Sequence, residues 1–396
     1  MHGSPSGIVD DRGWRLSAAK PLPRWADLVL LPAVCLAVAL LAAGAVVALV
    51  GQNPAEVISV LVHGAFGTAR GFSYTLYYAT TFVFTGLAVA VAFHGGLFNI
   101  GGEGQAILGG LGTGLVALWF SAFLPAWIML PLMLVAGALF GMAWAVVPGY
   151  LQAYRGSHVV ITTIMFNFIA STLLVYLLVN HLRPVGAMSV ESVAFGDSAK
   201  LPGMHEALAW LGVEWPSSPL NLSVVIAAFA LVGVYLFLWH TRAGYRLRAV
   251  GSSPGAAHYA GIRPRRQVLL AMAVSGALAG LVGMNEIAGV HGKLLLEFVS
   301  GAGFTGIAVA LMGRNHPVGI LFASILFGAL FQGGAEVAFE VRGFSRDMVV
   351  MLQGFIVLFS GAMVYVIAPL VARVLQGVAG VFTGRGPSPG SGVSHG

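Results

Sequence analysis

Long apolar segments, each bounded by charges, proline, glycine or polar turns, follow one another along almost the whole chain. The hydrocarbon core of a bilayer is about 30 Å thick and requires about 20 apolar residues per helix. Ten segments approach this length, at roughly 27–50, 73–93, 105–122, 126–149, 159–180, 221–240, 267–288, 301–313, 317–335 and 348–371. The pattern predicts an all-α polytopic membrane protein with about ten transmembrane or partial helices.

Two of the predicted helices are short. Residues 301–313 cannot cross a bilayer alone, and a half-helix at membrane depth is tolerated only where other protein or water shields its backbone. We therefore expect this segment to pack inside the protein. After the first span, Asn53 as N-cap and Pro54 at the first helical position predict a short helix on the outer surface.

Composition and charge agree with a membrane protein and suggest its orientation. Only 9% of the residues are charged and the mean hydropathy is +0.89, whereas a soluble domain carries about 25% charged residues. Most lysines and arginines fall on the side of the N-terminus, which the positive-inside rule makes cytoplasmic. We expect a disordered cytoplasmic segment at 1–24, a transmembrane domain at 25–371 and a disordered cytoplasmic tail at 372–396.

The order of segments is compatible with an inverted five-plus-five repeat. Five segments precede the long outer loop 181–219 and five follow it, so the two halves would have opposite orientations. Each half carries a glycine-rich break with an acid between its second and third segments, HGGLFNIGGEGQ and HGKLLLEFVSGAGFTG. Corresponding breaks in two halves point to a transport site, although close helix packing also explains glycine-rich segments.

A few polar side chains lie within the apolar segments or on the first break, which carries Asn99, Glu103 and Gln105. Such groups are costly in a membrane and are candidates for a substrate path. The predicted path residues are Asn99, Glu103, Gln105, Asn167, Glu286 and Gln332, with Asn285 and Gln353 as further polar positions. A structural role stays open, because amides often tie helices together and the two acids could cap a neighbouring helix or backbone amides.

The chain lacks the common signatures of enzymes. None of its three lysines precedes Ser or Thr, so no phosphate-binding loop for ATP is present. The histidines and the single cysteine show no metal-ligand spacing. Ser275, in AVSGALAG, is typical of close helix packing rather than of a nucleophile. We expect a protein that is not an enzyme and carries no cofactor.

The arginine-rich loop RLRAVGSSPGAAHYAGIRPRRQ contains a predicted two-turn helix, Pro254–Ala260. Ser253 is a favourable N-cap, Pro254 suits the first turn, and Gly261 suits the C-terminal stop. A loop that only sets orientation needs no capped helix. The small residues and Tyr259 suit docking into the groove of a partner.

Four motifs together carry a family resemblance: FNIGGEGQ, ITTIMFNFIA, RAVGSSPGAAHYAGI and GFTGIAVALMGRNHPVG. They resemble the permease subunits of bacterial ABC importers, in the branch for branched-chain amino acids, simple sugars and nucleosides. Within this branch, the chain is most similar to the larger permease of nucleoside importers linked to basic membrane proteins. The resemblance covers about residues 27–370.

The resemblance implies a set of partners in the bacterial inner membrane. A second permease subunit would complete the pore as a heterodimer, and an extracytoplasmic solute-binding protein would dock on the outer loops, including 51–72 and 181–219. A separate ATPase subunit would use the ATP. The residues implied to couple to that ATPase are Ser253, Pro254, Gly255, Ala256, Ala257, His258, Tyr259 and Ala260.

The expected function is therefore that of a permease subunit of an ATP-driven importer, with nucleosides as first expected cargo and simple sugars next. The predicted path residues would give a neutral, hydroxyl-rich solute a polar lining. The alternative is a secondary transporter coupled to ions through Glu103 or Glu286. A gated channel would show a repeated ring of charges or carbonyls, which the sequence does not show.

Overall fold

The computed structural model describes residues 30–49, 51–210, 212–341, 348–351, 353–355, 367 and 369–372. In this part the elements are helices, with two isolated β-bridges and no strand, which confirms the predicted all-α class. The predicted disordered termini and most of the tenth apolar segment lie outside the described residues.

The chain divides into two compact units, residues 1–42 with 355–396 and residues 43–354. The second unit contains all the candidate residues.

The α-helices are α1 (Leu31–Leu49), α2 (Pro54–Val62), α3 (Ala69–His94), α4 (Gly102–Phe120), α5 (Ala126–Arg155), α6 (Val159–Leu177), α7 (Met204–Ala209), α8 (Ser223–His240), α9 (Arg242–Ser252), α10 (Pro254–Tyr259), α11 (Pro264–Gly280), α12 (Ala302–Met312) and α13 (Pro317–Glu340). Shorter turns are η2 (His63–Gly67), η3 (Leu178–Leu182), η4 (Asp197–Ala199) and η5 (Met284–His291).

Six helices in the described part are long and apolar enough to cross a membrane: α3, α5, α6 with η3, α8, α11 with η5, and α13. The chain is therefore an integral membrane protein. Helix α12 has 11 residues, about 16 Å at 1.5 Å per residue, and packs against α3, α4 and α13. The expectation of an internal partial helix at this position is confirmed.

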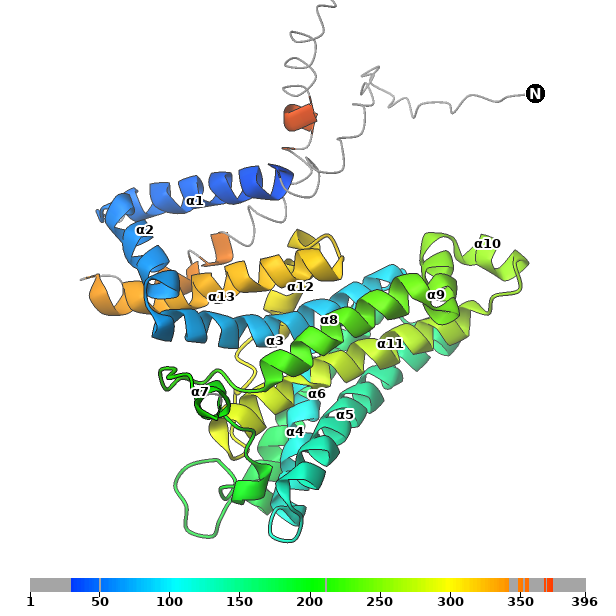
Figure 1. The fold of residues 1–396 in the computed structure, drawn as a ribbon. Coiled ribbons are helices and arrows are strands. Elements are labelled where there is room, and N and C mark those ends of the chain that lie inside the picture. Colours follow the sequence, from blue (N-terminus) through cyan, green and yellow to red (C-terminus); the bar gives the residue numbers. More distant parts are fainter. Residues whose placement is uncertain are drawn as a thin grey trace, which may run out of the picture. The chain divides into compact units, whose positions relative to one another are not determined.

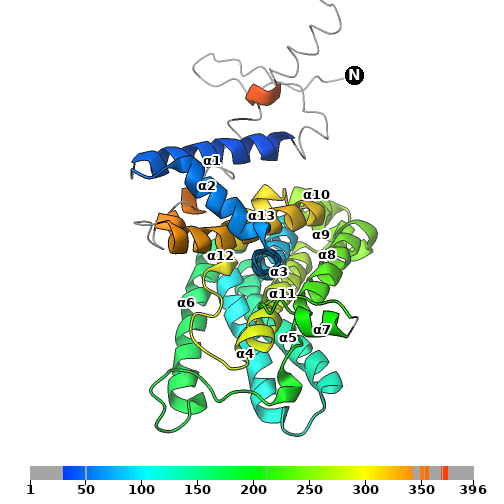
Figure 2. The same ribbon diagram turned by 60° about the vertical axis from the view of Figure 1, so that its left-hand side comes forward.

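Helix α3 is the central helix of the larger unit. In its most apolar window 78% of the residues are buried, against 28% in α5 and 22% in α8. It packs against α8, α11, α12 and α13 (Figures 1 and 2). The outer helices expose large apolar side chains such as Phe168 on α6 and Phe229 on α8, as expected for helices that face lipid.

Glycines allow α4, α5 and α11 to pack at very short distance. A Cβ atom on Gly276 would collide with the backbone oxygen of Gly141, and one on Gly280 with that of Gly137. A Cβ atom on Gly109 would collide with the backbone of Gly280. Because lipid offers little hydrophobic driving force between helices, small residues that permit close backbone approach stabilise such contacts.

The first glycine-rich break is shorter than predicted. Helix α3 ends at His94, and Gly96, with a φ of 74°, turns the chain before α4 begins at Gly102. Glu103 therefore lies in the first turn of a helix, and its prediction on the non-helical break is wrong, whereas Gln105 lies in α4 as the predicted segment 105–122 has it. An acid in the first turn is stabilised by the helix dipole, so Glu103 favours helix where its glycine neighbours suggested a loop.

The long loop after η3 is ordered against the ends of the helices. The amide of Ser192 donates to the carbonyl of Leu294 at 2.8 Å, and the amide of Phe195 to that of Gly292 at 2.8 Å. Trp215 Nε1 donates to Ser73 Oγ at 2.7 Å. This loop and α7 lie at the opposite end of α8 and α11 from α9 and α10 (Figure 1).

Candidate functional site

Asn99 and Gln105 form a buried network at the start of α4. Asn99 Nδ2 donates to Gln105 Oε1 at 3.0 Å, and Gln105 Nε2 donates back to Asn99 Oδ1 at 3.1 Å. Asn99 also donates to Ser275 Oγ at 2.9 Å, and the Ser275 hydroxyl donates to the carbonyl of Ala88 at 2.7 Å. The network connects the break to both α3 and α11.

Asn167, on α6, satisfies the backbone of the same break. Its Oδ1 accepts a hydrogen bond from the amide of Gly104 at 2.9 Å, and its Nδ2 donates to the carbonyl of Ile100 at 2.9 Å. Buried backbone groups need such partners. Asn167 therefore holds the non-helical segment in place against α6.

Glu103 joins the N-terminus of α4 to that of α12. Its two carboxylate oxygens accept hydrogen bonds from the amides of Gly301 at 2.9 Å and Gly303 at 2.8 Å. Gly301 has a φ of 78° and directly precedes α12. The first amides of a helix lack partners within the helix, and a carboxylate there also interacts with the helix dipole. This is the geometry of a carboxylate that caps a neighbouring helix, which was one of the two roles considered for Glu103 from the sequence.

Glu286 lies in a second network, on the π-helical turn η5 and 5% exposed. The Tyr77 hydroxyl donates to Glu286 Oε2, and the Thr81 hydroxyl donates to Oε1 at 2.6 Å. Asn285 Nδ2 donates to Thr81 Oγ1 at 2.7 Å, and Asn221 Nδ2 donates to Asn285 Oδ1 at 3.1 Å. The network links α3, η5 and the segment before α8.

The remaining predicted polar residues lie elsewhere. Gln332, on α13, is 7% exposed and donates to Glu336 Oε1 at 3.0 Å. Gln353 donates to the carbonyl of Leu330 at 3.3 Å. The structure thus brings Asn99, Gln105 and Asn167 together around the break and the start of α4, where Glu103 also lies. It places Glu286, Gln332 and Gln353 at separate positions.

Sequence reasoning missed several partners in these networks. Tyr77 and Thr81 both bind Glu286, and their spacing of four places them on one face of α3. That spacing was a usable signal. Ser275, interpreted as a packing residue, is fully buried and also binds Asn99.

The arginine-rich loop forms the predicted helix, α10. Ser253 Oγ accepts a hydrogen bond from the amide of Ala256 at 3.3 Å, and Gly261 has a φ of 76° after the helix. Seven of the eight predicted coupling residues are exposed, and Tyr259 is 95% exposed. Ala257 is buried against the rest of the chain, so it does not belong to the outward face.

An ion pair fixes the long loop at the other end of the molecule. Lys293 Nζ lies 2.8 Å from Glu191 Oε2, and Glu191 is bridged in antiparallel fashion to Leu295. Hydrogen bonds from Lys293 and then Ser189 hold the pKa of Glu191 below its ordinary value. The carboxylate therefore stays ionised to lower pH than that of a free glutamate.

Long apolar helices, breaks between helices and a buried polar centre together define a membrane-embedded transport subunit. The sequence agrees. Residues 71–361 match the family described as branched-chain amino acid transport system / permease component, and the chain belongs to this family. It is a transport permease and not an enzyme.

Relatives whose names state a transport function match most of the chain. It is 34% identical to a glucose ABC transporter permease protein of Haloferax volcanii, over 83% of this chain and 86% of the relative. It is 34% identical to a nucleoside ABC transporter permease protein of Lactococcus lactis, over 84% and 90%. A guanosine ABC transporter permease protein of Bacillus subtilis is 35% identical over 81% and 89%. A second nucleoside permease of the same Lactococcus is 28% identical over 68% and 82%.

Proposed function

We propose that this chain forms one half of the pore of an ATP-driven importer, with nucleosides as cargo. Three of the four relatives described above carry names that specify nucleoside or guanosine transport, and this favours nucleosides over glucose, the cargo in the name of the fourth. The second permease found in the Lactococcus supports a heterodimer. The bacterial inner membrane, cytoplasmic termini and an extracytoplasmic binding protein belong to the same proposal.

The observation that carries the proposal is the exposed, capped helix α10. This helix has six residues, lies between basic segments and exposes 95% of Tyr259. It therefore makes few contacts that stabilise the rest of the chain. It fits the groove of a separate ATPase subunit. The ATPase would supply the energy in trans, because the chain has no phosphate-binding loop.

The loop after η3 and the helix α2 are the proposed docking region for a solute-binding protein. They lie at the end of the bundle opposite α10 (Figure 1). The loop exposes the apolar side chains Val185, Met188 and Trp210 almost completely. Exposed apolar side chains held on an ordered loop are suited to a partner surface.

The test is uptake of radiolabelled guanosine into proteoliposomes that contain this chain with its partner permease, ATPase and binding protein. Uptake should require ATP and all subunits. Tyr259→Ala should reduce ATP-driven uptake at least about tenfold, as expected for an aromatic side chain at the centre of an interface. Tyr245→Ala is the matched control, because Tyr245 is also exposed, at 64%, but lies on α9.

Other outcomes would change the proposal in defined ways. Uptake by the chain alone, driven by a proton gradient, would replace the importer by an ion-coupled transporter. If the assembly hydrolyses ATP and takes up glucose but not guanosine, the protein remains an importer permease and its cargo is glucose. If the Tyr259 and Tyr245 variants lose ATP-driven uptake equally, α10 is not the element that couples the chain to the ATPase.

A further inference from the structure

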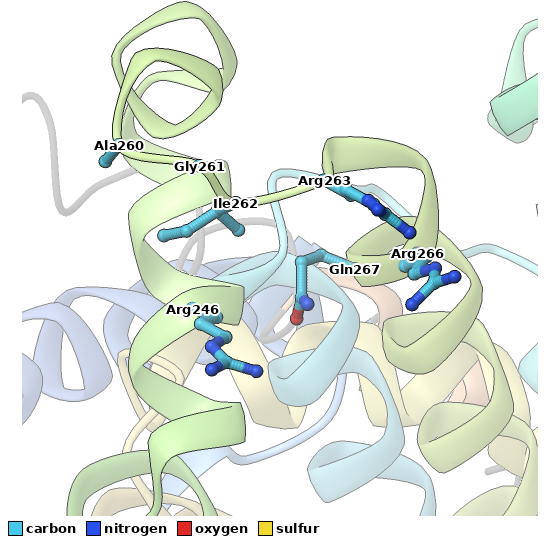
Figure 3. A pocket seen from close by; sticks show the side chains of 7 residues that line it. All are labelled: Arg246, Ala260, Gly261, Ile262, Arg263, Arg266 and Gln267. Carbon is cyan, nitrogen blue, oxygen red and sulfur yellow. The ribbon is translucent and has the colours of Figure 1, made fainter.

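A pocket of about 270 Å³ lies at the foot of α10, between α9 and the start of α11. Its lining contains three arginines, Arg246 from α9 and Arg263 and Arg266 from the start of α11. Figure 3 shows Arg246 on one side of the pocket, the other two arginines on the opposite side, and Gln267 between them. The proposed ATPase contact on α10 does not use any of these four side chains.

The charge of this arginine pocket is not balanced within the described part of the chain. The ion pairs found there, Lys200 with Asp197 and Lys293 with Glu191, both involve residues of other segments. The loop from Arg242 to Gln267 contains no acid at all. Three guanidinium groups around one concave site form a binding site for an anion, most strongly for one with several oxygens, such as a phosphate.

Gln267 restricts the chemistry of the ligand further. Its side-chain oxygen is buried and has no hydrogen-bond partner, and an unpaired buried acceptor is costly. A carboxylate or a fully ionised phosphate, which has no O–H group to donate, would occupy the arginines and leave this acceptor unpaired. A phosphate ester with a neighbouring hydroxyl group would satisfy the guanidinium groups and, once the buried Gln267 side chain turns into the pocket, the amide oxygen as well.

The position of the pocket indicates where such a ligand comes from. Gln267 lies in the first turn of a helix that can span the membrane, residues Pro264–His291. Beside it, Arg265 lies 5.4 Å over the ring of Tyr154, near the end of α5. Tyrosine and arginine at the ends of spanning helices are typical of the headgroup level.

We propose that the arginine pocket binds the headgroup of an anionic glycerophospholipid, with the phosphate on the arginines and a headgroup hydroxyl donating to Gln267. Phosphatidylglycerol has this chemistry. Basic pockets between helices near one membrane face bind anionic headgroups in this manner. The proposal requires only that the chain is embedded in a membrane and holds whichever solute it transports.

The test is native mass spectrometry of the purified full-length chain titrated with short-chain phosphatidylglycerol, with phosphatidylcholine as the neutral reference. The double variant Arg263→Gln/Arg266→Gln should weaken phosphatidylglycerol binding about thirtyfold, since each basic group near an anionic headgroup contributes about a fivefold factor. The control Arg155→Gln/Arg242→Gln removes the same charge from the surrounding surface and should change binding by less than about threefold. If both double variants lose the same affinity for phosphatidylglycerol, or if Arg263→Gln/Arg266→Gln loses none, the proposal that this pocket binds the headgroup is wrong.

Further arms identify the ligand. Gln267→Leu should lower the affinity for phosphatidylglycerol. At a pH where phosphatidic acid is fully ionised and has no O–H group to donate, the affinity for that lipid should stay unchanged; equal effects on both lipids would refute the role of Gln267. If glycerol 3-phosphate competes at the same concentration as the lipid, the source is a soluble phosphate ester and the lipid assignment is wrong. If the ATPase subunit displaces the lipid and fails to bind the Arg263/Arg266 variant, the pocket is a protein contact instead.

Discussion

Glu103→Gln tests whether the carboxylate that joins α4 to α12 is structural. Both carboxylate oxygens accept backbone hydrogen bonds, at 2.9 Å and 2.8 Å. A glutamine keeps one acceptor and presents an NH₂ group to the second amide, which stays unpaired. Such a group costs about 1–3 kcal/mol, and loss of the charge at the helix end costs about 0.3–1 kcal/mol more. We expect the free energy of unfolding to fall by about 1–4 kcal/mol.

The measurement is thermal unfolding of the purified chain in detergent, followed by tryptophan fluorescence. Because the unfolding entropy grows with chain length, the expected loss in a chain of 396 residues corresponds to a decrease in Tm of about 2–5 °C. Glu297→Gln is the matched control, because Glu297 is an exposed acid in the same segment before α12, and its Tm should stay within about 1 °C. A Glu103→Gln protein as stable as this control, yet unable to transport, would refute the capping role and return Glu103 to the substrate path.

Three further changes probe other parts of the fold. Asn167→Ala leaves two buried backbone groups unpaired and should lower unfolding stability by about 2–4 kcal/mol, whereas Asn180→Ala, at an exposed side-chain bond, should cost under about 1 kcal/mol. Gly276→Val should push α5 away from α11 and lower the free energy of unfolding by about 3 kcal/mol. The control Gly233→Val should lower it less, because a side chain at that position meets open space. Thermal unfolding followed by tryptophan fluorescence measures both variants. The lowered pKa of Glu191 stabilises the pairing of its loop above the ordinary pKa, and this contribution is lost as the pH falls through the folded-state pKa. The protection of that loop against amide exchange, taken relative to the intrinsic rate at each pH, should therefore fall on acidification, and Glu191→Gln should abolish this pH dependence.

Each of these expectations has an outcome that contradicts it. If the two asparagine variants were equally stable, the break would not depend on its side-chain bonds. A tolerated valine at 276 would mean that the two helices do not approach as closely as the glycines indicate. Protection against amide exchange that stays constant in the wild-type loop as the pH falls would show that the ion pair does not hold that loop.

Local signals in the sequence predicted the spans and the short capped helices well. The helix α10 follows from Ser253, Pro254 and Gly261, and α2 from Asn53 and Pro54, because a cap acts on amides two or three residues away. Apolar runs likewise locate α5 and α8, since burial in lipid needs no particular partner. The start of α4 was misplaced because glycine-rich sequence suits a loop and the N-terminus of a helix alike.

The partnerships within the polar centre were not predictable from these signals. Asn99 and Ser275 are 176 positions apart, and Glu103 and Gly301 are 198 apart. Which polar groups meet depends on the rotation of each helix and on the depth of each break, and one sequence gives neither. The sequence identified the costly polar groups, and the fold decided which of them bind one another.

The hydrogen bonds of these groups also constrain how the subunit can change shape. A side chain offers a solute only those donors and acceptors that are free, and Asn99, Gln105 and Glu103 already commit part of theirs to one another, to Ser275 or to backbone amides. Releasing each bond without replacement costs about 1–3 kcal/mol. A movement that carries α4 and α12 together keeps the bonds of Glu103, whereas one that separates these helices breaks both. If import proceeds by alternation between outward and inward access, that change would therefore cost less when these two helices move as one body.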